Sequence, residues 1–171
     1  VITLHGTGPW DVARYQIRAW DSLAEEKGFI VAAPLLDSAV WPIMFRGSWR
    51  EDLASDERKI LAVLDHVAGR YRIDRDRVLL TGFSAGGYPL YYTGLRNPEK
   101  FSMLIARACN SDPEIFERIE LSDAARSLPI YIYWGQDDAG VISEQSWQAV
   151  HFLRTHRCYG TRWEKVEGGH V

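Results

Sequence analysis

The residues Gly82-Phe83-Ser84-Ala85-Gly86 lie between an apolar run, Val78-Leu79-Leu80-Thr81, and a segment of helical composition that ends at Asn97-Pro98. A Gly-x-Ser-x-Gly sequence between a strand and a helix predicts a sharp turn, the nucleophile elbow, which exposes its central serine at the end of a sheet. Side chains at the two glycine positions would collide across such a turn. Ser84 is therefore the candidate nucleophile. The alternative is a glycine-rich connection in another kind of α/β protein.

Strand-like and helix-like segments alternate along the whole chain. Repeated strand–helix–strand units predict an α/β fold with a mostly parallel sheet, helices on both faces and right-handed crossovers. No linker or repeat interrupts the pattern, so we expect one domain over residues 1–171. The expected strands are 1–4, 29–33, 77–81, 101–108, 130–134 and 162–166, and the expected helices are 11–27, one that contains 60–71, and 144–157.

Composition narrows the class of protein. The chain has 171 residues, of which 46% are hydrophobic, and its net charge is −3 with no basic run. Nothing here suggests a nucleic-acid or anionic-membrane partner, and no apolar stretch is long enough to span a bilayer. Cys109 and Cys158 match no metal spacing and are expected to be buried thiols, although a disulfide stays open. The chain begins without Met and ends one residue after His170, so both ends are expected to be clipped.

A serine nucleophile needs a base, and the base needs an acid partner that fixes its tautomer. In hydrolases with this elbow the acid and then the histidine follow the serine in the chain. His151 and His156 fall within a predicted helix and are expected on its surface. His170 follows Glu167-Gly168-Gly169 beyond the last strand, at the end of the sheet where ligands bind. His170 is therefore the candidate base.

The acid is expected just after a strand that lies between the elbow and the histidine. Asp137 and Asp138 follow such a strand, and the offset of Asp138 from Gly135 favours Asp138. Asp112 is an outside candidate, but its place before Pro113 is more typical of a helix start.

The developing oxyanion needs aimed hydrogen-bond donors. We expect one from the backbone N–H of Ala85 and one from the loop His5-Gly6-Thr7-Gly8, with Thr7 favoured over Gly6. His5 precedes the serine and is expected to brace this loop rather than act as the base.

These segments, together with Gly135-Gln136-Asp137-Asp138 and Gly168-Gly169-His170, resemble the α/β-hydrolase superfamily. The run Tyr71-Arg72-Ile73-Asp74-Arg75-Asp76-Arg77-Val78 resembles the polyhydroxybutyrate depolymerase and feruloyl esterase-like group. The resemblance covers essentially the whole chain, although the strands that normally precede the His-Gly loop are absent. It implies a serine esterase with a covalent acyl-enzyme intermediate, no metal or other cofactor, and the acid at Asp138. It also makes a secreted or periplasmic protein one possibility, while the sequence leaves the location open.

The loop 34–50 leaves the end of a strand and is expected to overhang Ser84. Its aromatic side chains Trp41, Phe45 and Trp49 suit an acyl or aromatic group of a small-molecule or polymeric ester, or else pack the loop onto the body. Carboxylic-ester hydrolysis is the favoured function. A serine peptidase of the prolyl-oligopeptidase type and a non-catalytic binding protein with the same fold are the alternatives.

Overall fold

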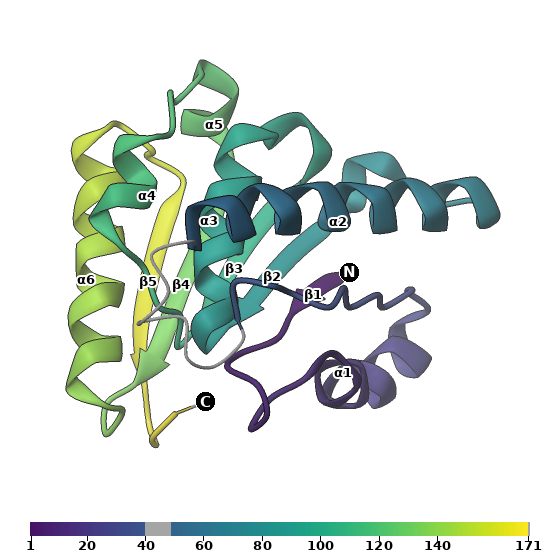
Figure 1. Cartoon of the computed structure of the whole chain (residues 1–171), viewed down its shortest axis with the longest axis horizontal. Helices are drawn as coiled ribbons and strands as arrows, with labels where there is room; N and C mark the ends of the chain where they lie inside the picture. Colours follow the sequence, from purple (N-terminus) through teal and green to yellow (C-terminus); the bar gives the residue numbers. More distant parts are fainter. Residues whose placement is uncertain (40–48, 171) are drawn as a thin grey trace.

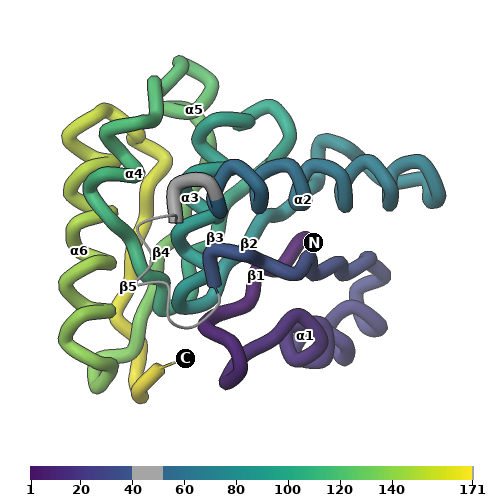
Figure 2. Tube along the Cα trace, in the orientation of Figure 1, coloured from purple at the N-terminus to yellow at the C-terminus, as the bar shows by residue number. Residues whose placement is uncertain are grey.

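A computed structural model describes residues 1–39 and 49–170 of the chain (Figures 1 and 2). Within the described residues, five strands form one sheet in the order β1-β2-β3-β4-β5, and every neighbouring pair is parallel. The register places Leu4 opposite Gly82 and Gly135 opposite Val166. The strands are β1 (Ile2–Leu4), β2 (Leu79–Phe83), β3 (Met103–Arg107), β4 (Ile130–Gly135) and β5 (Thr161–Val166). The predicted parallel α/β sheet is confirmed.

Helices cover both faces of this sheet. Helix α1 (Ala13–Lys27) lies on one face, whereas α2 (Trp49–Arg70), α3 (Gly87–Arg96) and α6 (Gly140–Thr155) lie on the other (Figure 1). Gly28 ends α1 in the left-handed conformation that glycine adopts readily. The short elements are α4 (Pro113–Glu117), α5 (Asp123–Ser127) and the 3₁₀ turns η2 (Arg75–Arg77), η3 (Ser84–Gly86) and η4 (Pro98–Lys100).

The core lies mainly between the sheet and the α2–α3–α6 layer. Alternate side chains of the strands point toward that layer, and Leu4, Leu80, Leu104 and Ile132 among them are fully buried. No helix in the described part of the chain is long and apolar enough to cross a membrane.

The expected strand 29–33 is reduced to a single parallel bridge between Ile2 and Ala32. Two backbone hydrogen bonds hold it, Thr3 N to Ala32 O (2.9 Å) and Ala32 N to Val1 O (3.0 Å). Pro34 follows and has no N–H to continue the ladder, which explains why the prediction of a full strand was wrong. Helix α6 also begins four residues earlier than the predicted Glu144.

Candidate active site

The elbow has the steric features that the sequence predicts. Ser84 follows β2 directly and has a φ of 52°, an uncommon and strained value for a residue with a side chain. A Cβ atom on Gly82 would lie 2.6 Å from the carbonyl oxygen of Gly86, and one on Gly86 would lie 2.7 Å from that of Leu4. Both positions therefore require glycine. The N–H of Ala85 lies at the start of a helical turn, where backbone donors have no partner within the helix.

The loop after β1 packs against this elbow. A Cβ atom on Gly6 would lie 3.0 Å from Ser84 Cβ, so the two backbones approach closely. Gly6 N donates to Asp11 Oδ2 (2.6 Å) and Gly8 N donates to Ala39 O (2.9 Å). Thr7 N makes no hydrogen bond to another described residue. Of the two donors considered from the sequence, Gly6 is thus occupied and Thr7 is available.

His5 braces the loop, as expected. Its ring is buried; Leu36 N donates to Nε2 (3.0 Å), and Nδ1 lies 2.8 Å from the carbonyl oxygen of Gly6. Because Nε2 accepts a hydrogen bond, Nδ1 carries the proton and donates it to that carbonyl. Both ring nitrogens are therefore engaged within the fold.

Asp138 and His170 lie together at the end of β4. His170 Nδ1 is 2.9 Å from Asp138 Oδ2 and 3.0 Å from Oδ1, and Ala139 N donates to Oδ1 (2.7 Å). The Asp138 side chain is 1% exposed, whereas that of His170 is 39% exposed. Asp137, the rejected alternative, is exposed. A carboxylate that accepts from Nδ1–H leaves Nε2 free to take a proton, which is the arrangement a general base needs.

A close backbone contact holds the loop 167–170, the histidine loop, beside Asp138. A Cβ atom on Gly135 would lie 1.8 Å from the carbonyl oxygen of Gly169, so only glycine allows the loop to approach. Asp137 N donates to Gly168 O (3.0 Å), and Gln136 N donates to Val166 O (2.8 Å). The loop that carries Asp138 and the histidine loop are therefore fixed to each other.

His170 is also next to the elbow. Its ring centroid lies 4.7 Å from that of Phe83, the residue before Ser84. Among the described residues no hydrogen bond joins Ser84 Oγ to His170. Catalytic hydrogen bonds often tighten only when substrate binds, so this geometry is compatible with a serine–histidine pair.

The other titratable candidates have structural places. Asp112 accepts from Glu114 N (2.8 Å) as the N-cap of α4, which confirms the helix-start interpretation. His151 and His156 are exposed on α6 and at its C-cap. Cys109 and Cys158 are both buried free thiols, as expected. Trp41 and Phe45 lie outside the described residues; Trp49 starts α2, but its side chain is not described.

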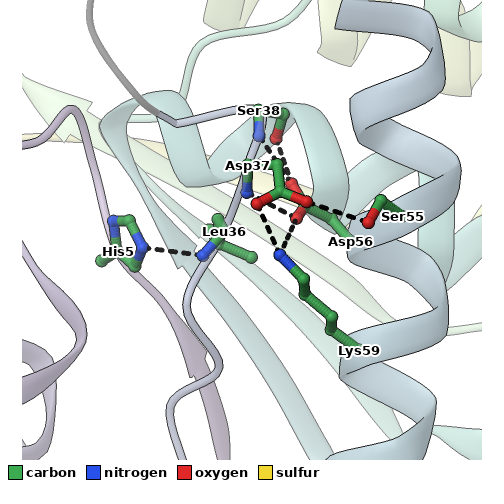
Figure 3. Close-up of polar contacts among 7 residues, drawn as sticks. All are labelled: His5, Leu36, Asp37, Ser38, Ser55, Asp56 and Lys59. Carbon is green, nitrogen blue, oxygen red and sulfur yellow. Dashed lines mark hydrogen bonds and ion pairs between the residues drawn. The ribbon is translucent and has the colours of Figure 1, made fainter.

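A carboxylate that the sequence interpretation missed anchors the segment 36–38 (Figure 3). Asp56, on α2, is fully buried and accepts from Asp37 N (2.7 Å), Ser38 N (2.9 Å) and Ser38 Oγ (2.5 Å). Burial raises the pKa of Asp56, opposed by these hydrogen bonds and by Lys59, whose Nζ is 3.8 Å away. His5 binds the same segment at Leu36. The segment is thus held from two elements, beside the loop after β1.

A model of the prolyl oligopeptidase family matches residues 22–126, which include the elbow. The chain belongs to the prolyl oligopeptidase family. A curated protein, the bifunctional acetylxylan esterase/xylanase XynS20E of Neocallimastix patriciarum, is 28% identical to this family member over 157 residues. The match covers 92% of the present chain but only 21% of XynS20E, so the chain spans about a fifth of that relative's length.

Solved structures share the fold of this prolyl oligopeptidase family member. The esterase PE8 has a TM-score of 0.75 at 22% identity, with 99% of this chain and 83% of PE8 covered. The protein SOBER1 from Arabidopsis thaliana has a TM-score of 0.72 at 16% identity, with 99% of this chain and 89% of SOBER1 covered. These similarities confirm the α/β-hydrolase fold. The narrower likeness to the polyhydroxybutyrate depolymerase and feruloyl esterase-like group stays a prediction.

Proposed function

We propose that this chain is a serine hydrolase that cleaves carboxylic esters through an acyl-enzyme intermediate. Ser84 is the nucleophile, His170 the base, and Asp138 the acid that orients it. The observation that carries the proposal is the contact of 2.9 Å between His170 Nδ1 and the buried Asp138 carboxylate, beside a strained elbow. A protein that used this fold only for binding would not require that combination.

The chemistry follows from the positions of these groups. His170 Nε2 accepts the proton of the Ser84 hydroxyl as the oxygen attacks the ester carbonyl, and the Nδ1–H···Asp138 bond stabilises the imidazolium that forms. The carbonyl oxygen becomes negatively charged and is stabilised by the N–H groups of Ala85 and Thr7. His170 then protonates the leaving alcohol. Water, deprotonated by the same histidine, attacks the acyl-enzyme and releases the acid.

Two observations point to different leaving groups. The relative whose match covers 92% of this chain at 28% identity is named a bifunctional acetylxylan esterase/xylanase, and the esterase part of that name supports an ester substrate. The family description, in contrast, supports a serine peptidase, and this is the second candidate. An amine departs only when the histidine protonates it, so amide cleavage demands tighter general-acid geometry than ester cleavage. The esterase relative matches nearly the whole of this chain, so we favour ester cleavage.

The test compares esters and amides that carry the same acyl group. We expect acetyl and short-chain p-nitrophenyl esters to be hydrolysed with a much higher kcat/KM than the matched p-nitroanilides and aminoacyl amides. The control is Ser84→Ala, which should lower kcat by on the order of 10⁶ without unfolding the protein. Incubation with a chelator should leave the activity unchanged. Turnover of the amides at the rate of the matched esters would replace this proposal by the peptidase alternative.

A further inference from the structure

A chain of hydrogen bonds runs from the middle of the sheet to the loop after β1. Arg107, on β3, donates from Nη2 to Gln16 Oε1 on α1 (2.5 Å). Gln16 Nε2 donates to Asp11 Oδ2 (2.7 Å), the same oxygen that accepts from Gly6 N (2.6 Å). One carboxylate oxygen therefore joins the loop to the interface between α1 and the sheet.

At the sheet end of this network, the Arg107 guanidinium is hydrogen-bonded to side chains of other strands. Arg107 Nε donates to Thr81 Oγ1 (3.0 Å), and Arg107 Nη2 also lies 3.2 Å from Thr3 Oγ1. Thr3, Gln16 and Thr81 are all buried. Arg107 Cζ lies 5.7 Å from the ring centroid of Phe83, the residue before Ser84 in the elbow. Its position is thus fixed by three elements.

A buried charged network is uncommon at an interface between a helix and a sheet, where apolar side chains usually pack. Burial lowers the pKa of Arg107 because the charged guanidinium is desolvated, and the Asp11 carboxylate opposes that effect. Well-packed apolar side chains in place of a buried charged network are often neutral or stabilising. Stability alone therefore does not account for it. Its far end, however, contacts the loop that supplies an oxyanion donor.

We propose that Asp11 is a positioning residue for the oxyanion hole, and that Gln16 and Arg107 hold its carboxylate in the orientation that this role needs. The inference rests on the proposed function. By accepting the Gly6 N–H, Asp11 fixes the His5–Gly6 peptide plane, while Ala39 O fixes the Thr7–Gly8 plane. The Gly6–Thr7 peptide lies between these two planes, and its carbonyl accepts from His5 Nδ1. The Thr7 N–H, which belongs to that peptide, is then held in one orientation. Asp11 itself does not touch the substrate.

A donor that is aimed at the oxyanion acts in the transition state, so its loss should lower kcat and leave KM nearly unchanged. Removing one oxyanion donor typically costs about 10²–10³ in kcat. Asp11→Ala should approach that loss. Asp11→Asn keeps one oxygen acceptor but loses the charge-assisted bonds, so it should recover part of the activity and remain about tenfold below wild type. Asp21→Ala, which replaces an exposed aspartate on α1, is the matched control.

A second readout separates positioning from general structure. A trifluoromethyl ketone forms a tetrahedral adduct with the serine that carries an oxyanion. Its inhibition constant should therefore rise in Asp11→Ala by about the factor by which kcat falls, whereas KM for the ester should stay unchanged. Arg107→Met should lower kcat in the wild-type background and have little further effect in the Asp11→Ala background, because both act on one network.

The outcomes are distinguishable. If wild-type protein neither hydrolyses esters nor binds the ketone, the proposed function fails. If wild type does both, but Asp11→Ala and Asp11→Asn match Asp21→Ala in kcat and in ketone affinity, the positioning role is overturned. The role would also be overturned if Asp11→Asn lost kcat only in proportion to the fraction of protein that unfolds, while the folded Asp11→Asn protein kept the wild-type ketone affinity.

Discussion

Replacing Gly135 with alanine should separate His170 from Asp138 while leaving the sheet intact. The new Cβ atom would lie 1.8 Å from Gly169 O and 2.3 Å from Gly168 O. Nonbonded heavy atoms pack best at about 3.5 Å or more and repel each other at much shorter distances. The loop that carries His170 would therefore have to move away by roughly 1.5 Å or more. Both clashing atoms are backbone carbonyls, so a side-chain rotation offers no relief.

That displacement exceeds what the acid–base pair can absorb. His170 Nδ1 is 2.9 Å from Asp138 Oδ2, and a shift of roughly 1.5 Å would take the pair beyond hydrogen-bonding distance. Misplacement of a catalytic group by about 1 Å can cost about 10²-fold in rate. We therefore expect kcat for a p-nitrophenyl ester to fall by at least about 10²-fold, because the imidazole loses both its orientation and its counter-charge.

The matched control is Gly140→Ala, five residues further on at the start of α6. A Cβ atom there meets nothing within 4 Å, so kcat should stay within about twofold of wild type. Circular dichroism and thermal unfolding of both variants establish that the sheet is retained. A folded Gly135→Ala protein with wild-type kcat would refute the reasoning, since it would show that catalysis does not depend on the His170–Asp138 contact.

Other single contacts can be tested by substitution or labelling. Asp138→Asn should lower kcat by on the order of 10⁴, whereas Asp137→Asn should change it little; the reverse ranking in steady-state assays would mean that the acid is misassigned. Asp56→Asn should lower the free energy of unfolding by about 1–3 kcal/mol, because a buried N–H of Ser38 loses its acceptor. Burial raises the pKa of Asp56, so the native state binds a proton at a higher pH than the unfolded state does. In urea titrations, wild type should therefore gain stability relative to Asp56→Asn as the pH falls from neutral toward about 4. A stability difference that stays constant with pH would contradict that sign. Burial raises the pKa of Cys109 to about 12, so this thiol should not react with Ellman's reagent at neutral pH until the protein is denatured, and prompt labelling of the native protein would refute its placement.

The elbow could be predicted because its constraints are local. A turn that requires glycine on both sides of a serine leaves the same trace in any sequence, and the contacts of Gly82 and Gly86 give the physical reason. The position of His170 followed from chain order and from its place after the last strand. The strand 29–33, in contrast, was predicted from composition alone. Its pairing depends on what lies beside it, and only Ala32 forms a bridge.

Asp11, Gln16 and Asp56 were missed because their roles arise from contacts between separate segments. Asp56 and Gln16 nevertheless left a weak signal. Asp56 shares one face of α2 with Leu53, Ile60 and Leu64, all buried, so a carboxylate interrupts an apolar stripe at helical spacing. Gln16 is likewise buried on the inner face of α1. A polar residue on the buried face of a helix indicates a partner, although the sequence does not say which segment supplies it.

The central claim, that Ser84 is an activated nucleophile, is tested most directly by labelling with a fluorophosphonate probe, followed by proteolysis and mass spectrometry. The account predicts one probe per chain, attached to the peptide that contains Ser84, and no labelling in a folded Ser84→Ala protein. Labelling should also slow strongly in His170→Ala, since the hydroxyl loses its base. A label on another residue, or labelling that persists in Ser84→Ala, would contradict the account.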